Sequence, residues 1–289
     1  MSIIGTAPQP MTTATTDLPV TRGRHRRIAG RILRTVLPPA VILVVVVAVW
    51  QLCTILFDIP DYLVPSPSDL VHELGPALPG LVQPTLVTMQ EAYGGFVIAA
   101  VAGFVAAVVM SRWSFAERGM YPYLVLLQTI PIIAVAPILV VWLGAGIATN
   151  TIVAAIIAVF PVAANTLTGL KSTERNLVQL FEMAGANKTH QLIVLRVPFA
   201  LPYILTGLRI AAGSAVVGAI VGEFVAGIGG GEGGLGYVIT STAQQLMTSR
   251  LFLAVIAASL VSLLLFGIIR AIEAVTLRRW HESAMSSEE

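Results

Sequence analysis

Six apolar segments, each close to the length that a helix needs to cross a lipid bilayer, constrain the fold of this chain more than any other feature. A transmembrane helix needs about 20 apolar residues to cross roughly 30 Å of hydrocarbon. Inside the hydrocarbon a backbone must satisfy its own N–H and C=O groups, so spanning segments of this length have to be helical. We therefore predict an all-α membrane protein with six transmembrane helices. These helices cover residues 36–57, 87–110, 123–143, 151–170, 201–225 and 251–271.

The composition agrees with hydrocarbon as the solvent of most of the chain. Only 11% of the residues are charged and 56% are hydrophobic, whereas soluble domains carry about 25% charged residues. We expect a disordered basic terminus over residues 1–35, a transmembrane domain over residues 36–280 and a short tail over residues 281–289. The first apolar segment is too long for a typical secretory signal, and no small-residue cleavage site follows it.

Basic residues fall mainly on one side of the predicted membrane. If the N-terminus lies in the cytoplasm, only Arg209 and Arg250 of the 17 Lys and Arg residues fall elsewhere than on the cytoplasmic side. Because cytoplasmic loops carry an excess of Lys and Arg, we predict that both termini are cytoplasmic. The arginine-rich stretch 22–34 flanks the first span, where such runs contact anionic lipid more often than nucleic acid. We therefore expect the lipid membrane, and no nucleic acid, as a partner.

The polar loop over residues 171–198 has the pattern of two short helices around a glycine. Residues spaced i, i+3, i+4 and i+7 predict an apolar stripe on the first helix: Leu177, Leu180, Phe181 and Ala184. The opposite face is polar and includes Glu182. Gly185 stands where a left-handed residue would end this helix, and Asn187 is a candidate N-cap for a second helix that runs to Leu195.

Two surfaces are able to cover the apolar stripe. An amphipathic helix that rests on lipid usually carries several Lys or Arg residues on its polar face, and this helix carries one. A stripe with a flank of mixed charge fits a groove in another protein better. The loop is therefore predicted to present a helix to a partner protein.

This loop resembles the cytoplasmic EAA loop of ABC importer permeases. In that family an acidic-Ala-Ala start is followed by Gly, and then by a Leu-Pro element that opens the next span. Here Gly185 and Ala186 are followed by a similar element over residues 198–209. The chain departs at the start, where Gln179 takes the place of the acidic residue. Further stretches are similar to the nitrate, sulfonate and taurine branch of the family: residues 63–68, 130–144 and 234–237.

The resemblance implies a subunit of the type I ABC importer kind in a bacterial inner membrane. It implies that two copies pair as a homodimer, that two ATPase subunits bind the loop, and that an extracytoplasmic solute-binding protein delivers the cargo. The branch imports nitrate, sulfonates and taurine, and also thiamine precursors and riboflavin-like compounds. The residues implied in ATPase coupling are Leu177, Leu180, Phe181, Glu182, Ala184 and Gly185.

Polar residues inside the spans are candidates for a transport pathway, because charged groups are costly in hydrocarbon. They are Glu91, Gln128, Pro131, Arg209 and Glu223. Glu91 and Glu223 lie near span ends, from which they would also be able to reach the interface. Arg209 has three possible partners: a carboxylate in the bundle, an anionic substrate, or the cytoplasmic face. Gln128 and Pro131 suit either a kinked, pathway-lining helix or core packing.

Other classes of function lack residues to support them. No G-x-x-x-x-G-K-[ST] motif occurs, so ATP and Mg are expected on a partner ATPase and no cofactor is expected in this chain. The four histidines have no metal-ligand spacing and no clustered nucleophile and base stands out, so we predict no metal site, no catalytic residue and no enzyme. A stand-alone secondary transporter or channel is the alternative function, and it would need coupling carboxylates or inverted repeats.

Overall fold

The computed structural model describes the backbone of residues 23–228 and 233–285, and the side chains of residues 37–226 and 233–276. Within these ranges every regular element is a helix and no strand occurs. The predicted disorder of residues 1–22, and the tail residues 286–289, lie outside the described part. The helices are α1 (Gly23–Leu56), α2 (Pro67–Arg112), α3 (Ser114–Thr129), α4 (Ile132–Leu143), α5 (Ile147–Lys171), α6 (Arg175–Met183), α7 (Lys188–Gln191), η1 (Leu192–Arg196), α8 (Val197–Ile228), α9 (Leu235–Gln244) and α10 (Thr248–Met285).

Five of the described helices are long and apolar enough to cross a membrane, and a bent pair makes up to six. The class of an all-α membrane protein is therefore confirmed. The long helices lie in α1, α2, α5, the continuous α7–η1–α8 segment and α10. The chain divides into two compact units at Cys53, and the first unit contains most of α1. Residues 23–35, which we predicted to be disordered, continue this helix.

The predicted third span over residues 123–143 is not one helix. It consists of α3 and α4, which are bent by 99° relative to each other. Ile130 is extended, with φ −70° and ψ 125°. Pro131 explains the break, because its ring disfavours a helical conformation at the residue before it and it has no N–H to donate. A kink here was one of the two interpretations of the sequence, beside core packing, and the actual change of direction is close to a right angle.

The predicted second span is only the last part of α2, which is 46 residues long. Ser66 begins it with a capping box: the Asp69 N–H donates to Ser66 Oγ at 3.3 Å, and the Ser66 N–H donates to Asp69 Oδ2 at 2.8 Å. A helix of this length measures about 69 Å, more than twice the hydrocarbon thickness. Its first turns must therefore extend beyond the membrane unless the helix is strongly tilted.

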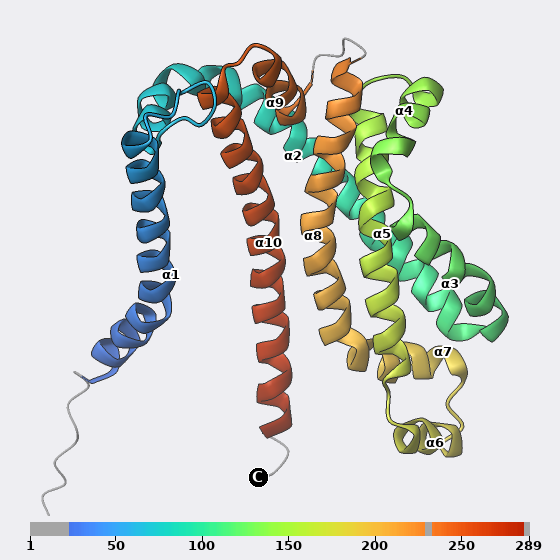
Figure 1. Ribbon diagram of the computed structural model, residues 1–289. Helices are drawn as coiled ribbons and strands as arrows, with labels where there is room; N and C mark the ends of the chain where they lie inside the picture. The colour runs from blue at the N-terminus through green and yellow to red at the C-terminus, as the bar shows by residue number, and fades with distance from the viewer. Residues whose placement is uncertain (1–22, 229–232, 286–289) are drawn as a thin grey trace, which may run out of the picture. The chain divides into compact units, whose positions relative to one another are not determined.

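The core of the second unit forms where α2, α5 and α8 pack together (Figure 1). Ala154 of α5 is fully buried and lies between Gly95 of α2 and Gly218 of α8. A Cβ atom at Gly95 would lie 2.5 Å from the Cβ of Ala154, and one at Gly218 would lie 2.6 Å from its Cα. Small residues of this kind allow backbones to approach closely, which supplies packing energy between helices in lipid.

The helix backbones also approach closely nearer the α6 end of the bundle. The order of these contacts shows the relative directions of the helices. On α2, Gly103 packs on Val162 of α5, so these two helices run parallel. On α8, a Cβ at Gly207 would lie 2.8 Å from the carbonyl oxygen of Pro161, so α8 runs antiparallel to α5. The three helices therefore form one continuous interface.

The glycine contacts lead to a paired stability prediction within α2. Gly95→Ala places a Cβ against Ala154, and overpacking of this kind costs about 1–3 kcal/mol. The control is Gly80→Ala in the same helix, because no atom lies within 4 Å of a Cβ built there. Thermal unfolding of the purified protein in detergent should show a lower midpoint for Gly95→Ala only. Equal midpoints for the two variants would contradict this packing.

Candidate functional site

The loop between α5 and α8 contains α6, which ends as the sequence predicted. Gly185 has φ +74°, in the region that favours glycine. Its N–H donates to the Glu182 carbonyl at 3.0 Å, and the Ala186 N–H donates to the Phe181 carbonyl at 3.0 Å. These two bonds form a Schellman motif. The glycine therefore ends α6 and turns the chain back toward the bundle.

A second helix follows this turn, as predicted, and continues without a break into α8. Asn187 is the N-cap of α7, and its Oδ1 accepts a hydrogen bond from the His190 N–H at 2.7 Å. The π-helical turn η1 then joins α7 to α8. Because the helix is continuous, a displacement of the α6–α7 loop acts directly on the start of α8.

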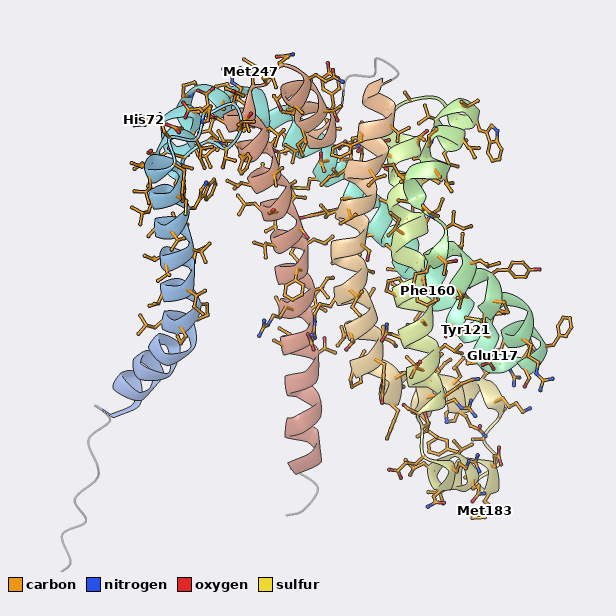
Figure 2. All side chains as sticks on the ribbon, in the orientation of Figure 1. His72, Glu117, Tyr121, Phe160, Met183 and Met247 are labelled. Carbon is orange, nitrogen blue, oxygen red and sulfur yellow. The ribbon has the colours of Figure 1, made fainter. Side chains whose placement is uncertain are left out.

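The predicted apolar stripe of α6 is only partly covered. No residue of α6 is buried. Leu177 and Phe181 are half-buried, and the Phe181 ring lies 6.4 Å from the His190 ring between centroids. Leu180 is 55% exposed and Met183 is 82% exposed, and Figure 2 shows Met183 at the edge of α6 away from the bundle. The loop thus carries apolar side chains that nothing in the described chain covers.

At the other end of the bundle, the structure brings together two of the predicted pathway residues. Glu91 of α2 and Glu223 of α8 are neighbours and both are 1% exposed, so neither reaches out to an interface. Asn150 of α5 donates from Nδ2 to Glu91 Oε1 at 2.9 Å. Thr88 donates from Oγ1 to Glu223 Oε1 at 2.6 Å. The result is a buried polar cluster at the meeting point of α2, α5 and α8.

Glu223 also attaches the short helix α9, an element that we did not predict. The Gly236 N–H donates to Glu223 Oε2 at 2.5 Å, and the Leu235 N–H donates to Thr88 Oγ1 at 2.8 Å. A Cβ at Gly234 would lie 2.0 Å from Glu223 Oε1, so only glycine fits there. The Gly-Leu-Gly stretch that follows an intramembrane glutamate was the feature of the sequence that could have indicated this attachment.

Arg209 belongs to a different contact, between α8 and α10. Its guanidinium forms an ion pair with Glu273, a residue that we had not singled out. This pair corresponds to the first of the three partners considered for Arg209, a carboxylate in the bundle. Arg209 precedes Glu223 by 14 positions, which is about 21 Å along a helix. Gln128 and Pro131 are exposed near the α3–α4 break and form no hydrogen bond with the described pathway candidates.

A concave surface lies at the α9 end of the second unit. Figure 1 shows α9 at the opposite end of α8 from α6. It encloses about 570 Å³ between the turn before α2 and the turn between α9 and α10. Arg250 donates from Nε to Glu73 Oε1 at 2.7 Å, and Thr248 donates from Oγ1 to the Tyr62 carbonyl at 2.6 Å. These two contacts join α10 to α2 and to the preceding turn.

Comparison with known proteins gives a consistent set of similarities. Residues 95–278 match the family model described as "Binding-protein-dependent transport system inner membrane component". The riboflavin transport system permease protein RibX of Chloroflexus aurantiacus is 33% identical over 92% of this chain and 98% of its own length. The formylaminopyrimidine transport permease protein ThiX of Halalkalibacterium halodurans is 35% identical over 83% and 95%. The taurine transport system permease protein TauC of Escherichia coli is 27% identical over 83% and 88%.

The two buried glutamates should differ in their effect on α9. An amide at position 223 has one acceptor oxygen for two donors, so Glu223→Gln leaves one donor unpaired at a cost of about 1–3 kcal/mol. We expect amide exchange at Leu235 and Gly236 to become at least about fivefold faster, which is the lower end of this cost. Glu91→Gln is the matched control because Glu91 bonds to α5. Hydrogen exchange with mass spectrometry measures both, and an equal effect of the two variants would refute the attachment.

The Arg209–Glu273 pair predicts loss and rescue of stability. Glu273→Gln or Arg209→Gln removes a charged hydrogen bond worth about 1.5–3 kcal/mol. The exchanged pair, Arg209→Glu with Glu273→Arg, should recover part of this loss in a denaturation experiment. Arg270→Gln on α10 is the control, since Arg270 is exposed and forms none of the described ion pairs. A control as unstable as Glu273→Gln would argue against the pair.

Proposed function

The chain belongs to the family of binding-protein-dependent transport system inner membrane components, and from this premise we propose that it is the permease subunit of an ATP-driven importer. One observation of the structure supports the proposal most directly. Between two apolar helices, the chain holds a short helix whose apolar side chains Leu180 and Met183 are uncovered. An amphipathic helix of this kind fits a hydrophobic groove in a partner. The partner is the ATPase, because the chain has no P-loop of its own.

In this proposal α6 transmits the state of the ATPase to the membrane helices. Two copies of the chain pair as a homodimer around a pathway, and each α6 docks on one of two ATPase subunits. ATP binding closes the ATPase dimer and moves the two α6 helices together. The continuous α7–η1–α8 segment passes this movement to α8, so the pathway opens outward, and hydrolysis resets it. The loop is thus the element whose position the nucleotide state biases.

The distribution of basic residues supports an orientation in a bacterial inner membrane with both termini and α6 in the cytoplasm. The α9 end then faces outward. There the concave surface around Glu73 and Arg250 is available to an external solute-binding protein that delivers the cargo. The surface combines both signs of charge with exposed apolar side chains such as Leu246, as many protein contact surfaces do.

The cargo is a small solute, either of the vitamin and vitamin-precursor type or of the nitrate, sulfonate and taurine type. The relatives named for riboflavin and formylaminopyrimidine transport are 33% and 35% identical, and the taurine relative is 27% identical. These values favour the vitamin or vitamin-precursor type. Glu223 gives no competing indication, because both of its carboxylate oxygens already accept hydrogen bonds from the protein. Selection of the cargo is therefore assigned to the binding protein.

A stand-alone secondary transporter is the alternative that the buried carboxyl groups would favour, since ion-coupled carriers use intramembrane carboxylates. Glu223 holds α9 and Thr88, however, and Arg209 is paired with Glu273. Such contacts are those of a structural framework. The exposed α6 also has no role in a carrier that works alone.

Docking through α6 is tested by changing one exposed apolar side chain. Leu180→Asp places a charge in the proposed contact, and loss of a central contact residue costs at least about 2 kcal/mol, or roughly 30-fold in affinity. Asn176→Asp adds the same charge at an exposed polar position of the same helix. Co-purification with the co-expressed partner ATPase should fail for Leu180→Asp and persist for Asn176→Asp. Retention of the ATPase by both variants would exclude α6 as its docking helix.

A further inference from the structure

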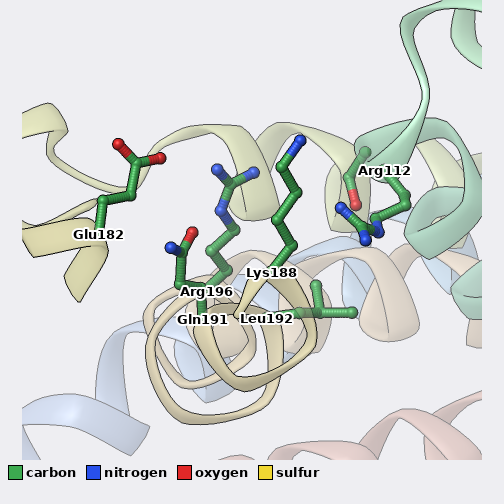
Figure 3. A pocket seen from close by; sticks show the side chains of 7 residues that line it. Arg112, Glu182, Lys188, Gln191, Leu192 and Arg196 are labelled. Atoms are coloured by element: carbon green, nitrogen blue, oxygen red, sulfur yellow. The ribbon is translucent and has the colours of Figure 1, made fainter. Parts of the chain in front are cut away.

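A basic pocket lies beside the α6–α7 loop, where the end of α2 meets η1. It encloses about 210 Å³. Arg112 is the last residue of α2, Lys188 the first of α7, and Arg196 the last of η1. Figure 3 shows Lys188 and Arg196 extending in the same direction, with Arg112 next to Lys188 and Glu182 on the other side. The end of α2 and the consecutive α7–η1 segment, which are far apart in the sequence, thus bring three cations to one opening.

None of these cations forms an ion pair within the described part of the chain. The ion pairs among described side chains join Lys171 to Glu117, Arg209 to Glu273 and Arg250 to Glu73. None of them involves Arg112, Lys188 or Arg196, and Glu182 lies beyond ion-pair distance of all three. Like charges gathered in a partly enclosed space repel one another unless an anion lies among them. The pocket is therefore complementary to a small, multiply coordinated anion.

The position of the pocket relative to the membrane identifies the kind of anion. Arg112 ends an apolar helix and is followed by Trp113, which is 58% exposed. An exposed Trp at the end of a spanning helix marks the level of the lipid headgroups. Arg196 likewise stands directly before the apolar run of α8. The opening of the pocket is thus at the depth where phospholipid phosphates lie.

The residues that line and adjoin the pocket suit the phosphate of a lipid headgroup. Arg and Lys are the side chains that bind phosphate through several charged hydrogen bonds. On η1, Leu192 lines the pocket, and the neighbouring Ile193 and Val194 are exposed. The volume accommodates a phosphate and its glycerol group, and the acyl chains would lie on this apolar surface outside it.

We propose that this pocket binds the phosphate of an anionic phospholipid and thereby ties the end of α2 to the α7–η1 segment. The proposal requires that the chain spans a membrane, which the family shows, and it does not depend on ATPase docking by α6. A lipid phosphate held here lies between the bundle and the loop. Anionic lipid therefore restrains the loop relative to α2, and zwitterionic lipid alone does not.

Lipid retention by the purified full-length chain tests the proposal. Phosphatidylglycerol and phosphatidylcholine with identical acyl chains are titrated into the detergent-solubilised protein, and native mass spectrometry counts the lipid retained. The wild type should prefer phosphatidylglycerol. Arg112→Gln, Lys188→Gln and Arg196→Gln should each weaken its retention about fivefold, since each basic residue near an anionic lipid contributes on that scale. Circular dichroism confirms that each variant is folded.

The matched control is Arg118→Gln, which removes the same charge from an exposed position of α3 that does not line the pocket. It should retain phosphatidylglycerol as the wild type does. If Arg118→Gln loses as much lipid as Arg112→Gln, the attraction is a general surface-charge effect and the pocket is not a site. Unchanged retention in all three pocket variants would also overturn the proposal.

Two further arms separate lipid from other sources of an anion. Inorganic phosphate, added at the concentration of the lipid, should not displace phosphatidylglycerol, because it lacks the acyl chains that contact η1. Displacement would mean a site for free phosphate instead. In the complex with the ATPase, the lipid should stay bound. If assembly releases it and Arg112→Gln weakens ATPase binding, then carboxylates of the partner occupy the pocket and the lipid proposal is wrong.

Discussion

The close approach of α2, α5 and α8 is the constraint on which the other features of the bundle depend. Between helices in lipid the hydrophobic effect gives no attraction, so contact area and hydrogen bonds must supply the energy. Ala154 lies against Gly95 on one side and Gly218 on the other. One turn along α5, the same approach brings Asn150 to Glu91 and against Gly222, where a Cβ would lie 2.8 Å from Asn150 Oδ1. The glycines therefore determine where the buried polar groups meet.

The bundle and the α6 loop are held in different ways, and this difference suits a device that moves one part against the other. Glu223 and Thr88 attach α9 by hydrogen bonds, and Arg209 links α8 to α10 through Glu273. In contrast, α6 has no buried residue, and few buried contacts mean low local stability. The π-helical turn η1 lies at the joint between the two parts, and such turns are frequent at functional sites.

Local patterns predicted the features that depend on neighbouring residues. The glycine stop at Gly185 rests on contacts within a few positions and is confirmed. The capping box at Ser66 rests on contacts of the same short range. The contact of Glu223 with Thr88 joins residues 135 positions apart, which no local pattern records. The sequence also did not determine the right angle at Pro131. A proline explains where a helix ends, but tertiary packing decides in which direction the next helix begins.

Uptake by purified components reconstituted in lipid vesicles tests the central claim, that this chain is a pathway driven by a separate ATPase. Vesicles would contain this chain alone, or this chain with its ATPase, and would receive the cargo-loaded binding protein. The account predicts accumulation of labelled cargo only when the ATPase and ATP are both present. Accumulation by the chain alone, driven by an ion gradient and without ATP, would contradict it and identify a stand-alone carrier.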